Sequence, residues 1–138
     1  MTLKCVLDKK AIKPTRAHED DAGLDLYTPE FILLRPGSSV TIDTGVHIQI
    51  PKGFVGMVKS KSGLNVKRGI VSEGVIDAGY TGSIHVKLYN HGKDIVMINP
   101  EEKISQLVIM PIVTPDLEVV DALEETERGN GGFGSTGK

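Results

Sequence analysis

The chain has 138 residues, which is enough for one domain with a hydrophobic core. Its net charge of −2 and its pI of about 6.1 argue against a general nucleic-acid binder, which carries a strong basic excess. The apolar runs fall far short of the roughly 20 residues of a transmembrane helix, the N-terminus lacks a signal-peptide layout, and a single cysteine excludes an intrachain disulfide. We therefore expect a cytoplasmic protein, in the host cytoplasm if the source is viral, without membrane or stable nucleic-acid partners.

Short strands punctuated by turns dominate the predicted secondary structure. Near the N-terminus, Cys5 stands in a short apolar run, which favours a buried small hydrophobe over a nucleophile. Seven later segments alternate apolar and polar residues or are rich in β-branched residues, so we expect strands over residues 31–34, 40–42, 46–50, 54–58, 84–88, 95–98 and 107–113. Glycine and proline turn signals lie between them. Strands at this spacing predict an all-β sandwich, jelly roll or barrel.

The last part of the chain differs from the rest. Residues 117–127 can be scored as a helix, but their alternation favours a strand. From Arg128 on, the sequence is rich in glycine, which loses the most backbone entropy on ordering. The same stretch carries an arginine, the Phe133 ring and the Ser135–Thr136 pair, which are groups that bind phosphates and stack on bases. We expect a mobile tail that orders only over a flat, anionic ligand.

Two turn regions carry groups suited to phosphate chemistry. Residues 20–26 gather acidic side chains around Gly23, and this stretch is either a solvated loop entering a strand or a carboxylate near a hydrated Mg²⁺. Residues 59–64 combine lysines, hydroxyls and a glycine after an apolar strand. They form either a surface turn or a phosphate cradle in which backbone N–H groups, Lys61 and Ser62 neutralise oxygens.

A third turn region, residues 74–82, carries a candidate for general base catalysis. Asp77 follows an apolar pair and precedes a glycine turn, so we expect it at a strand end. There it either bonds its own backbone or orients and deprotonates a water molecule. Tyr80 is either a core residue with a satisfied hydroxyl or a flat wall for a sugar. The four histidines show no metal-ligand spacing, and we expect them on the surface or in strands.

Five segments, in this order, resemble the five motifs of the trimeric dUTPase family: residues 22–26, 60–64, 74–82, 102–108 and 128–137. The resemblance implies a distorted jelly roll, or β-clip, assembled as a homotrimer with three active sites at subunit interfaces. It divides the chain into a catalytic domain over residues 1–127 and a glycine-rich arm over residues 128–138 that closes over the nucleotide. Each site in the family draws its motifs from different chains.

The reaction implied by the resemblance is hydrolysis of dUTP to dUMP and pyrophosphate, with water attacking the α-phosphorus. This activity keeps uracil out of DNA and supplies dUMP for dTMP synthesis. The implied cofactor is Mg²⁺, held by the triphosphate and waters with no direct protein ligand, as Mg²⁺ prefers. Asp25 would act on it through water.

The resemblance also assigns individual roles, with Asp77 as the carboxylate that orients the attacking water. Phosphate contacts would come from Lys61, Ser62, Gly63, Gln106, Arg128, Ser135 and Thr136. Uracil and deoxyribose contacts would come from Gly74, Val75, Ile76, Tyr80, His85, Phe133 and Gly134. The sequence departs from the family pattern at Lys61, where arginine is commonest, and at Gly79, where many members have a second acidic residue.

Two other functions compete with this one. A dCTP deaminase-like enzyme resembles dUTPases in fold, but Lys87 stands where that family has its glutamate, which argues against deamination. The other alternative is a non-catalytic jelly-roll module that binds a nucleotide or a protein. Some phage members of the family are thought to bind regulatory proteins, so a regulatory partner is also expected if the source is a phage.

Overall fold

The computed structural model describes residues 1–137, which form ten strands and one short helix. The elements are β1 (Lys4–Leu7), β2 (Gly23–Tyr27), β3 (Ile32–Leu34), β4 (Ser39–Asp43), β5 (Val46–Gln49), β6 (Phe54–Ser60), α1 (Ser62–Arg68), β7 (Ile70–Ile76), β8 (His85–Asn90), β9 (Val96–Ile98) and β10 (Lys103–Pro111). This composition confirms the all-β fold expected from the sequence.

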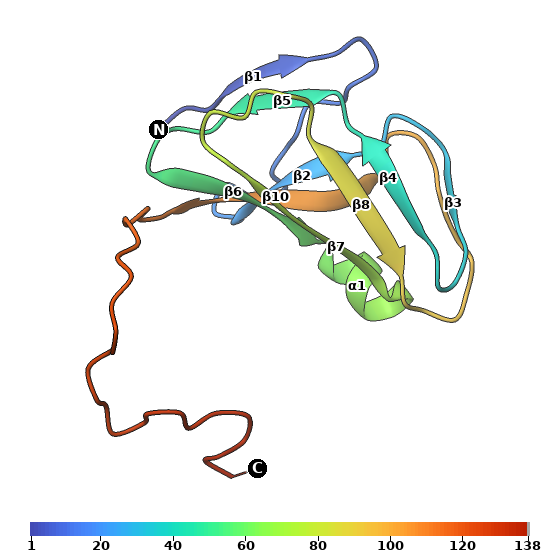
Figure 1. Cartoon of the computed structure of the whole chain (residues 1–138). Coiled ribbons are helices and arrows are strands. Elements are labelled where there is room, and N and C mark those ends of the chain that lie inside the picture. The colour runs from blue at the N-terminus through green and yellow to red at the C-terminus, as the bar shows by residue number, and fades with distance from the viewer. Residues whose placement is uncertain (138) are drawn as a thin grey trace.

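The strands form one large curled sheet and two small ribbons (Figure 1). The large sheet has the order β2-β10-β6-β7-β8-β4, and the ribbons pair β1 with β5 and β3 with β9. Every pairing is antiparallel. Alternate side chains of these strands point inward, as the period of two requires. They form most of one core, which includes Leu26, Ile42, Val58, Val86, Leu88, Ile104 and Leu107, together with Ile84 just before β8.

All seven strands predicted over residues 31–113 overlap observed strands. The prediction of a strand over residues 117–127 was wrong, because this stretch has no regular structure and all its residues are exposed. An extended segment becomes a strand only when it finds a neighbour to pair with. The expectation for Cys5 was also wrong: it lies on β1, whose four residues are all exposed.

After β10 the chain leaves the body and extends away from it (Figure 1), and from here on the whole of this segment, residues 113–137 as described, is called the arm. The backbone N–H of Ile112 donates to Gly53 at 2.9 Å, and residues 113–130 are exposed. The regular sheet therefore ends at Pro111, while the division at residue 128 stays a prediction. Lys138, the last residue of the predicted arm, lies outside the described residues. Within residues 1–137, no helix has the length and apolar character needed to cross a bilayer.

Candidate functional site

The first cluster of predicted residues surrounds Asp25, at the β2 edge of the large sheet. Strand pairing places Asp25 opposite Gln106 of β10, and Gln106 lies opposite Lys59 of β6. The chain then leaves β6 and reaches Lys61, whose Nζ binds Asp25 Oδ1. Gln106 Nε2 donates to the Ser60 carbonyl at 2.9 Å. The structure thus brings Asp25, expected beside the hydrated metal, together with Lys61 and Gln106, expected on the phosphate chain.

Asp25 is a buried carboxylate, with 4% of its surface exposed, and it holds two cations. Its second oxygen lies 2.8 Å from the Nζ of Lys103. Burial alone would raise the pKa of Asp25, but the hydrogen bonds and charges of Lys103 and Lys61 outweigh it and hold the pKa below its usual value. The carboxylate is therefore ionised, and it orients both lysines.

Sequence reasoning missed Lys103. The signal that could have found it is its position three residues before Gln106, inside the segment 102–108 that carries a family motif. On β10 its side chain stays partly exposed while its ammonium group reaches the buried carboxylate. Lys103 therefore fixes one side of Asp25 while Lys61 occupies the other.

The short helix α1 presents the remaining residues of the second motif. Lys61 is the residue before the helix and has an extended backbone, and Ser62 and Gly63 form the first turn, exposed to solvent. The helix ends because Gly69 takes the left-handed conformation, with φ of 69°, that a C-terminal cap requires. Lys61 therefore follows directly from the end of β6 and contacts Asp25, and Ser62 and Gly63 come next along the chain.

The second cluster lies where β7 turns into β8. Gly74, Val75 and Ile76 lie on β7, which ends one residue before Asp77, so the prediction of a strand end is confirmed. The Tyr80 N–H donates to the Asp77 carbonyl at 3.2 Å and closes the turn. A shallow depression of about 250 Å³ is lined by Val75, Ile76, Asp77, Tyr80, Ser83 and His85. Both Asp77 and Tyr80 are exposed at its rim.

The two clusters lie far apart within one chain. The β6–β7 register places Lys59 opposite Glu73 and Gly56 opposite Ile76. By extension of this register, Asp77 lies level with residue 55 of β6. The backbones of Lys61 and Asp77 are therefore about six residues apart along the strand direction, which corresponds to about 20 Å. The structure thus separates the phosphate cluster from the base and sugar cluster instead of joining them into one site.

The arm residues form a third group, separate from both clusters. Arg128 Nε donates to the Gly131 carbonyl at 2.9 Å, which closes a local turn. Phe133 is fully exposed and has a positive φ of 51°. From Val113 to Gly137, the hydrogen bonds of the described chain join arm residues only to one another. Arg128, Phe133, Gly134, Ser135 and Thr136 are thus not assembled with the body of their own chain.

The carboxylates offer a metal ion few direct ligands. Among residues 1–137, no group of three or more His, Cys, Asp or Glu side chains could hold an ion. Asp25 supplies hard oxygen donors, but both its oxygens are hydrogen-bonded to lysines. A single buried carboxylate of this kind fits a hydrated Mg²⁺ whose other ligands come from a phosphate chain and water.

Comparison with known proteins decides the family. The dUTPase family model matches residues 9–137. The chain belongs to the dUTPase family. It is 43% identical over 141 aligned positions to the deoxyuridine 5'-triphosphate nucleotidohydrolase of Clostridium tetani, covering 99% of this chain and 97% of that protein. The protein of the same name from Clostridium kluyveri is 46% identical, over 95% of this chain and 94% of its own length.

Solved dUTPase structures share the whole fold. The Staphylococcus bacteriophage 80alpha dUTPase, solved with dUPNHPP, superposes with a TM-score of 0.93 at 35% identity over 99% of both chains. That phage protein is described as controlling transfer of virulence genes by a G protein-like mechanism. A mutant dUTPase from phage phi11 of S. aureus, described with a structural Mg(II) ion, superposes with a TM-score of 0.81 at 33% identity. It covers 91% of this chain and 100% of its own.

The structure also shows the surroundings of Lys87, which stands where a glutamate is expected in a dCTP deaminase-like enzyme. Lys87 lies on β8, pairs with Thr41 of β4 and is exposed. Its ammonium group lies 5.2 Å from the centre of the Tyr89 ring, a cation–π distance. A lysine engaged in this way supplies no carboxylate for deamination.

Proposed function

We propose that this dUTPase hydrolyses dUTP to dUMP and pyrophosphate, with Asp77 orienting the water that attacks the α-phosphorus. The observation that carries the proposal is the position of Asp77, an exposed carboxylate directly after β7 and at the rim of the depression lined by Tyr80 and His85. A nucleoside bound in this depression brings its 5′-phosphate toward the rim. A carboxylate there accepts a proton from water as it attacks.

The base and the sugar are recognised in the same depression. Backbone groups of Gly74, Val75, Ile76 and His85 read the uracil edge, and the Tyr80 ring packs against the deoxyribose. Fixed backbone donors and acceptors that pair with uracil are left unpaired by cytosine, and this mismatch costs far more than a lost methyl contact. A ring held against the sugar leaves no room for a 2′-hydroxyl.

The phosphate chain binds to the cluster around Asp25. Lys61, held in place by Asp25, provides a positive charge beside the hydroxyl of Ser62, the backbone of Gly63 and the amide of Gln106. Phosphoryl transfer needs little covalent help from the protein, so positioning and charge neutralisation supply most of the rate. Bound Mg²⁺ would neutralise the triphosphate charge, with Asp25 holding one of its waters.

We further infer that the enzyme is a homotrimer whose sites combine residues from several chains. The separation of about 20 Å between Lys61 and Asp77 supports this, because a triphosphate whose α-phosphorus lies beside Asp77 is too short to reach Lys61 of the same chain. The arm supports it too. From Pro111 to Arg128 the chain advances 17 residues, which reach at most about 60 Å when extended. That is enough to reach a site on another subunit.

The arm supplies the last contacts in this scheme. Phe133 stacks on uracil, Gly134 allows close backbone approach, and Arg128, Ser135 and Thr136 bind phosphates. Base–aromatic stacking contributes about 1–3 kcal/mol in comparable complexes. A glycine-rich arm that opens and closes allows the product to leave in each cycle.

Substrate specificity tests the proposal directly. We expect pyrophosphate release with Mg²⁺ from dUTP and almost none from dTTP, dCTP or UTP, because each of the others meets an unpaired group or a steric clash. Coupled detection of pyrophosphate measures all four rates. Comparable rates with dTTP or UTP would contradict the specificity, and ammonia released from dCTP would support a deaminase instead.

Substitution of Asp77 tests its role. Asp77→Asn keeps the shape of the side chain but cannot accept the proton of water, so we expect turnover to fall at least about 100-fold. Binding of the analogue dUPNHPP, measured by calorimetry, should be retained. Asp116→Asn, on the exposed arm, is a matched control that should keep full activity. Full activity in Asp77→Asn would remove Asp77 from this role.

A further inference from the structure

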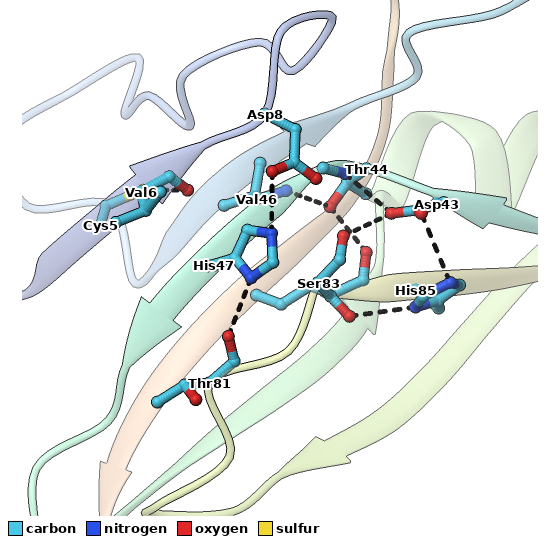
Figure 2. Close-up of polar contacts among 12 residues, drawn as sticks. Cys5, Val6, Asp8, Asp43, Thr44, Val46, His47, Thr81, Ser83 and His85 are labelled. Atoms are coloured by element: carbon cyan, nitrogen blue, oxygen red, sulfur yellow. Dashed lines mark hydrogen bonds and ion pairs between the residues drawn. The ribbon is translucent and has the colours of Figure 1, made fainter.

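The hairpin that carries Asp77 and Tyr80 is tied to β4 by a network centred on Asp43 (Figure 2). Asp43 is the last residue of β4, and the register places it opposite His85, the first residue of β8. Asp43 Oδ1 accepts hydrogen bonds from the Ser83 hydroxyl and, at 3.0 Å, from the Gly45 N–H. Asp43 Oδ2 lies 3.7 Å from Nε2 of His85. The Ser83 side chain is thus hydrogen-bonded to this carboxylate, and the His85 ring lies beside it.

The same network reaches the Tyr80 ring through the Ser83 carbonyl. The Tyr80 hydroxyl donates to this carbonyl at 2.9 Å, and Nδ1 of His85 lies 3.0 Å from it. Gly82 lets the ring lie close to the backbone, because a Cβ at that residue would come within 2.5 Å of the Tyr80 hydroxyl oxygen. The orientation of the ring therefore depends on where the Ser83 carbonyl is held.

A second set of contacts, with the same arrangement of groups, holds the neighbouring part of the hairpin. Nδ1 of His47 lies 2.8 Å from the Thr81 carbonyl, and its Nε2 lies 3.1 Å from Asp8 Oδ1. Around both His85 and His47, a hairpin carbonyl faces one ring nitrogen and an aspartate faces the other, as Figure 2 shows. An imidazole between two acceptors satisfies both only when both nitrogens carry protons. The Thr81 carbonyl and then Asp8 accordingly raise the pKa of His47.

We propose that Asp43 is a positioning residue that sets how strongly the site rejects a 2′-hydroxyl. Asp43 fixes the Ser83 hydroxyl and the His85 ring, these fix the Ser83 carbonyl, and the carbonyl holds the Tyr80 ring against the sugar. This inference rests on the proposed hydrolysis of dUTP. It adds residues that touch neither substrate nor water but control the shape of the sugar pocket.

The positions of these side chains separate the role from core stabilisation. Asp43 and His85 are exposed, with 59% and 51% of their side-chain surface accessible, so neither is needed to fill the core. The hairpin is held to the body by other buried groups: the Ile84 side chain lies in the core, and the Ile84 N–H donates to the Val46 carbonyl at 2.9 Å. Loss of the Asp43 carboxylate therefore leaves the hairpin folded while it frees the Ser83 carbonyl and the Tyr80 ring.

Three variants of the full chain test the proposal through kcat/KM for dUTP and for UTP. In Asp43→Ala and Ser83→Ala we expect the preference for dUTP over UTP to fall about tenfold, the effect of losing one charge-assisted hydrogen bond. Turnover of dUTP should change much less than this ratio. Asp43→Asn should keep most of the preference, because its amide oxygen still accepts from Ser83 and from the Gly45 N–H.

Ser38→Ala is the matched control, since the Ser38 hydroxyl donates to the Arg35 carbonyl at 2.6 Å in a turn remote from the hairpin. It should leave the ratio unchanged. Combining Asp43→Ala with Tyr80→Phe should lower the ratio by less than the product of the single effects, because both act on the same ring.

Several outcomes would overturn the role of Asp43. Equal losses for dUTP and UTP in Ser83→Ala, or full additivity in the double variant, would show a purely structural contribution. If Asp43→Ala does not fold, Ser83→Ala decides the question, because it leaves the carboxylate in place. A wild-type chain that releases no pyrophosphate from dUTP contradicts the proposed function. Normal dUTP turnover in Ser83→Ala, with an unchanged preference for dUTP over UTP, contradicts the role of Asp43 but leaves the proposed hydrolysis in place.

Discussion

At the scale of single residues, Asp25 shows how burial and charge are combined. A buried carboxylate is costly unless it is paired and hydrogen-bonded, and here each oxygen has its own lysine. The three groups are not equally buried, because the carboxylate is buried while the two ammonium groups remain partly in water. Lys61 can therefore turn toward a phosphate chain while Lys103 continues to neutralise Asp25. This arrangement also gives a reason why lysine, with its flexible stem, can replace the family's usual arginine at residue 61.

The stability of the protein should depend on pH through Asp25. Because the folded pKa lies below the ordinary value of 3.8, its contribution is fully present above that pH and is lost as the pH falls through the folded pKa. We expect Asp25→Asn to lower the free energy of unfolding by about 1–3 kcal/mol at pH 7. The difference from the wild type should shrink steadily below about pH 4.

Urea denaturation between pH 3 and 7, at one fixed protein concentration, measures both effects. Asp121→Asn, on the exposed arm, is the control and should match the wild type at every pH. A difference for Asp25→Asn that stays constant down to pH 3 would contradict the assigned pairing.

At the scale of elements, the sequence predicts the strands that alternate and misses β1, β2 and most of β7. The segments of β2 and β7 look like glycine-containing loops, since Gly23 and Gly74 weaken a strand signal. In the structure a Cβ at Gly23 would come within 2.2 Å of the Gln106 side chain, so the glycine makes room for it. The glycine that obscures the strand is therefore part of the phosphate cluster.

The helix α1 escapes sequence reasoning for a related reason. Its seven residues include Ser62 and Gly63 in the first turn, and none of the seven is buried, so it lacks an amphipathic pattern.

The short-range turn at Asp77 was predictable, because an acidic residue between an apolar pair and a glycine turn marks a strand end. The contacts of Asp43 and His47 were not, since they join residues 34 to 40 positions apart. Local periodicity carries no information on such pairs.

At the scale of the whole molecule, the residues of the proposed site lie in separate parts of the described chain. The proposed phosphate cluster around Asp25, the depression beside Asp77 and the arm are three separate groups. The arm also exposes Leu117, Val119 and Leu123 almost completely. Apolar side chains in an extended segment of this kind favour contact with another subunit. Assembly would thus cover the arm and complete the sites together.

Deletion of residues 128–138 should leave a folded trimer that has lost nearly all dUTP turnover, because the base stack and the arm's phosphate contacts are removed. Light scattering verifies the trimer, and pyrophosphate release measures the loss.

Mixing this truncated chain with full-length Asp77→Asn then tests whether two chains share one site. When each site takes Asp77 from one chain and its arm from another, random refolding of equal amounts makes about a quarter of the sites complete. The mixture of the two inactive proteins should therefore recover about a quarter of wild-type activity. A chain that carries both changes should recover no activity when it is mixed with either single variant. Mixed trimers that stay inactive would mean that the arm closes on its own chain, and the separation of Lys61 from Asp77 would then require a large rearrangement within one subunit.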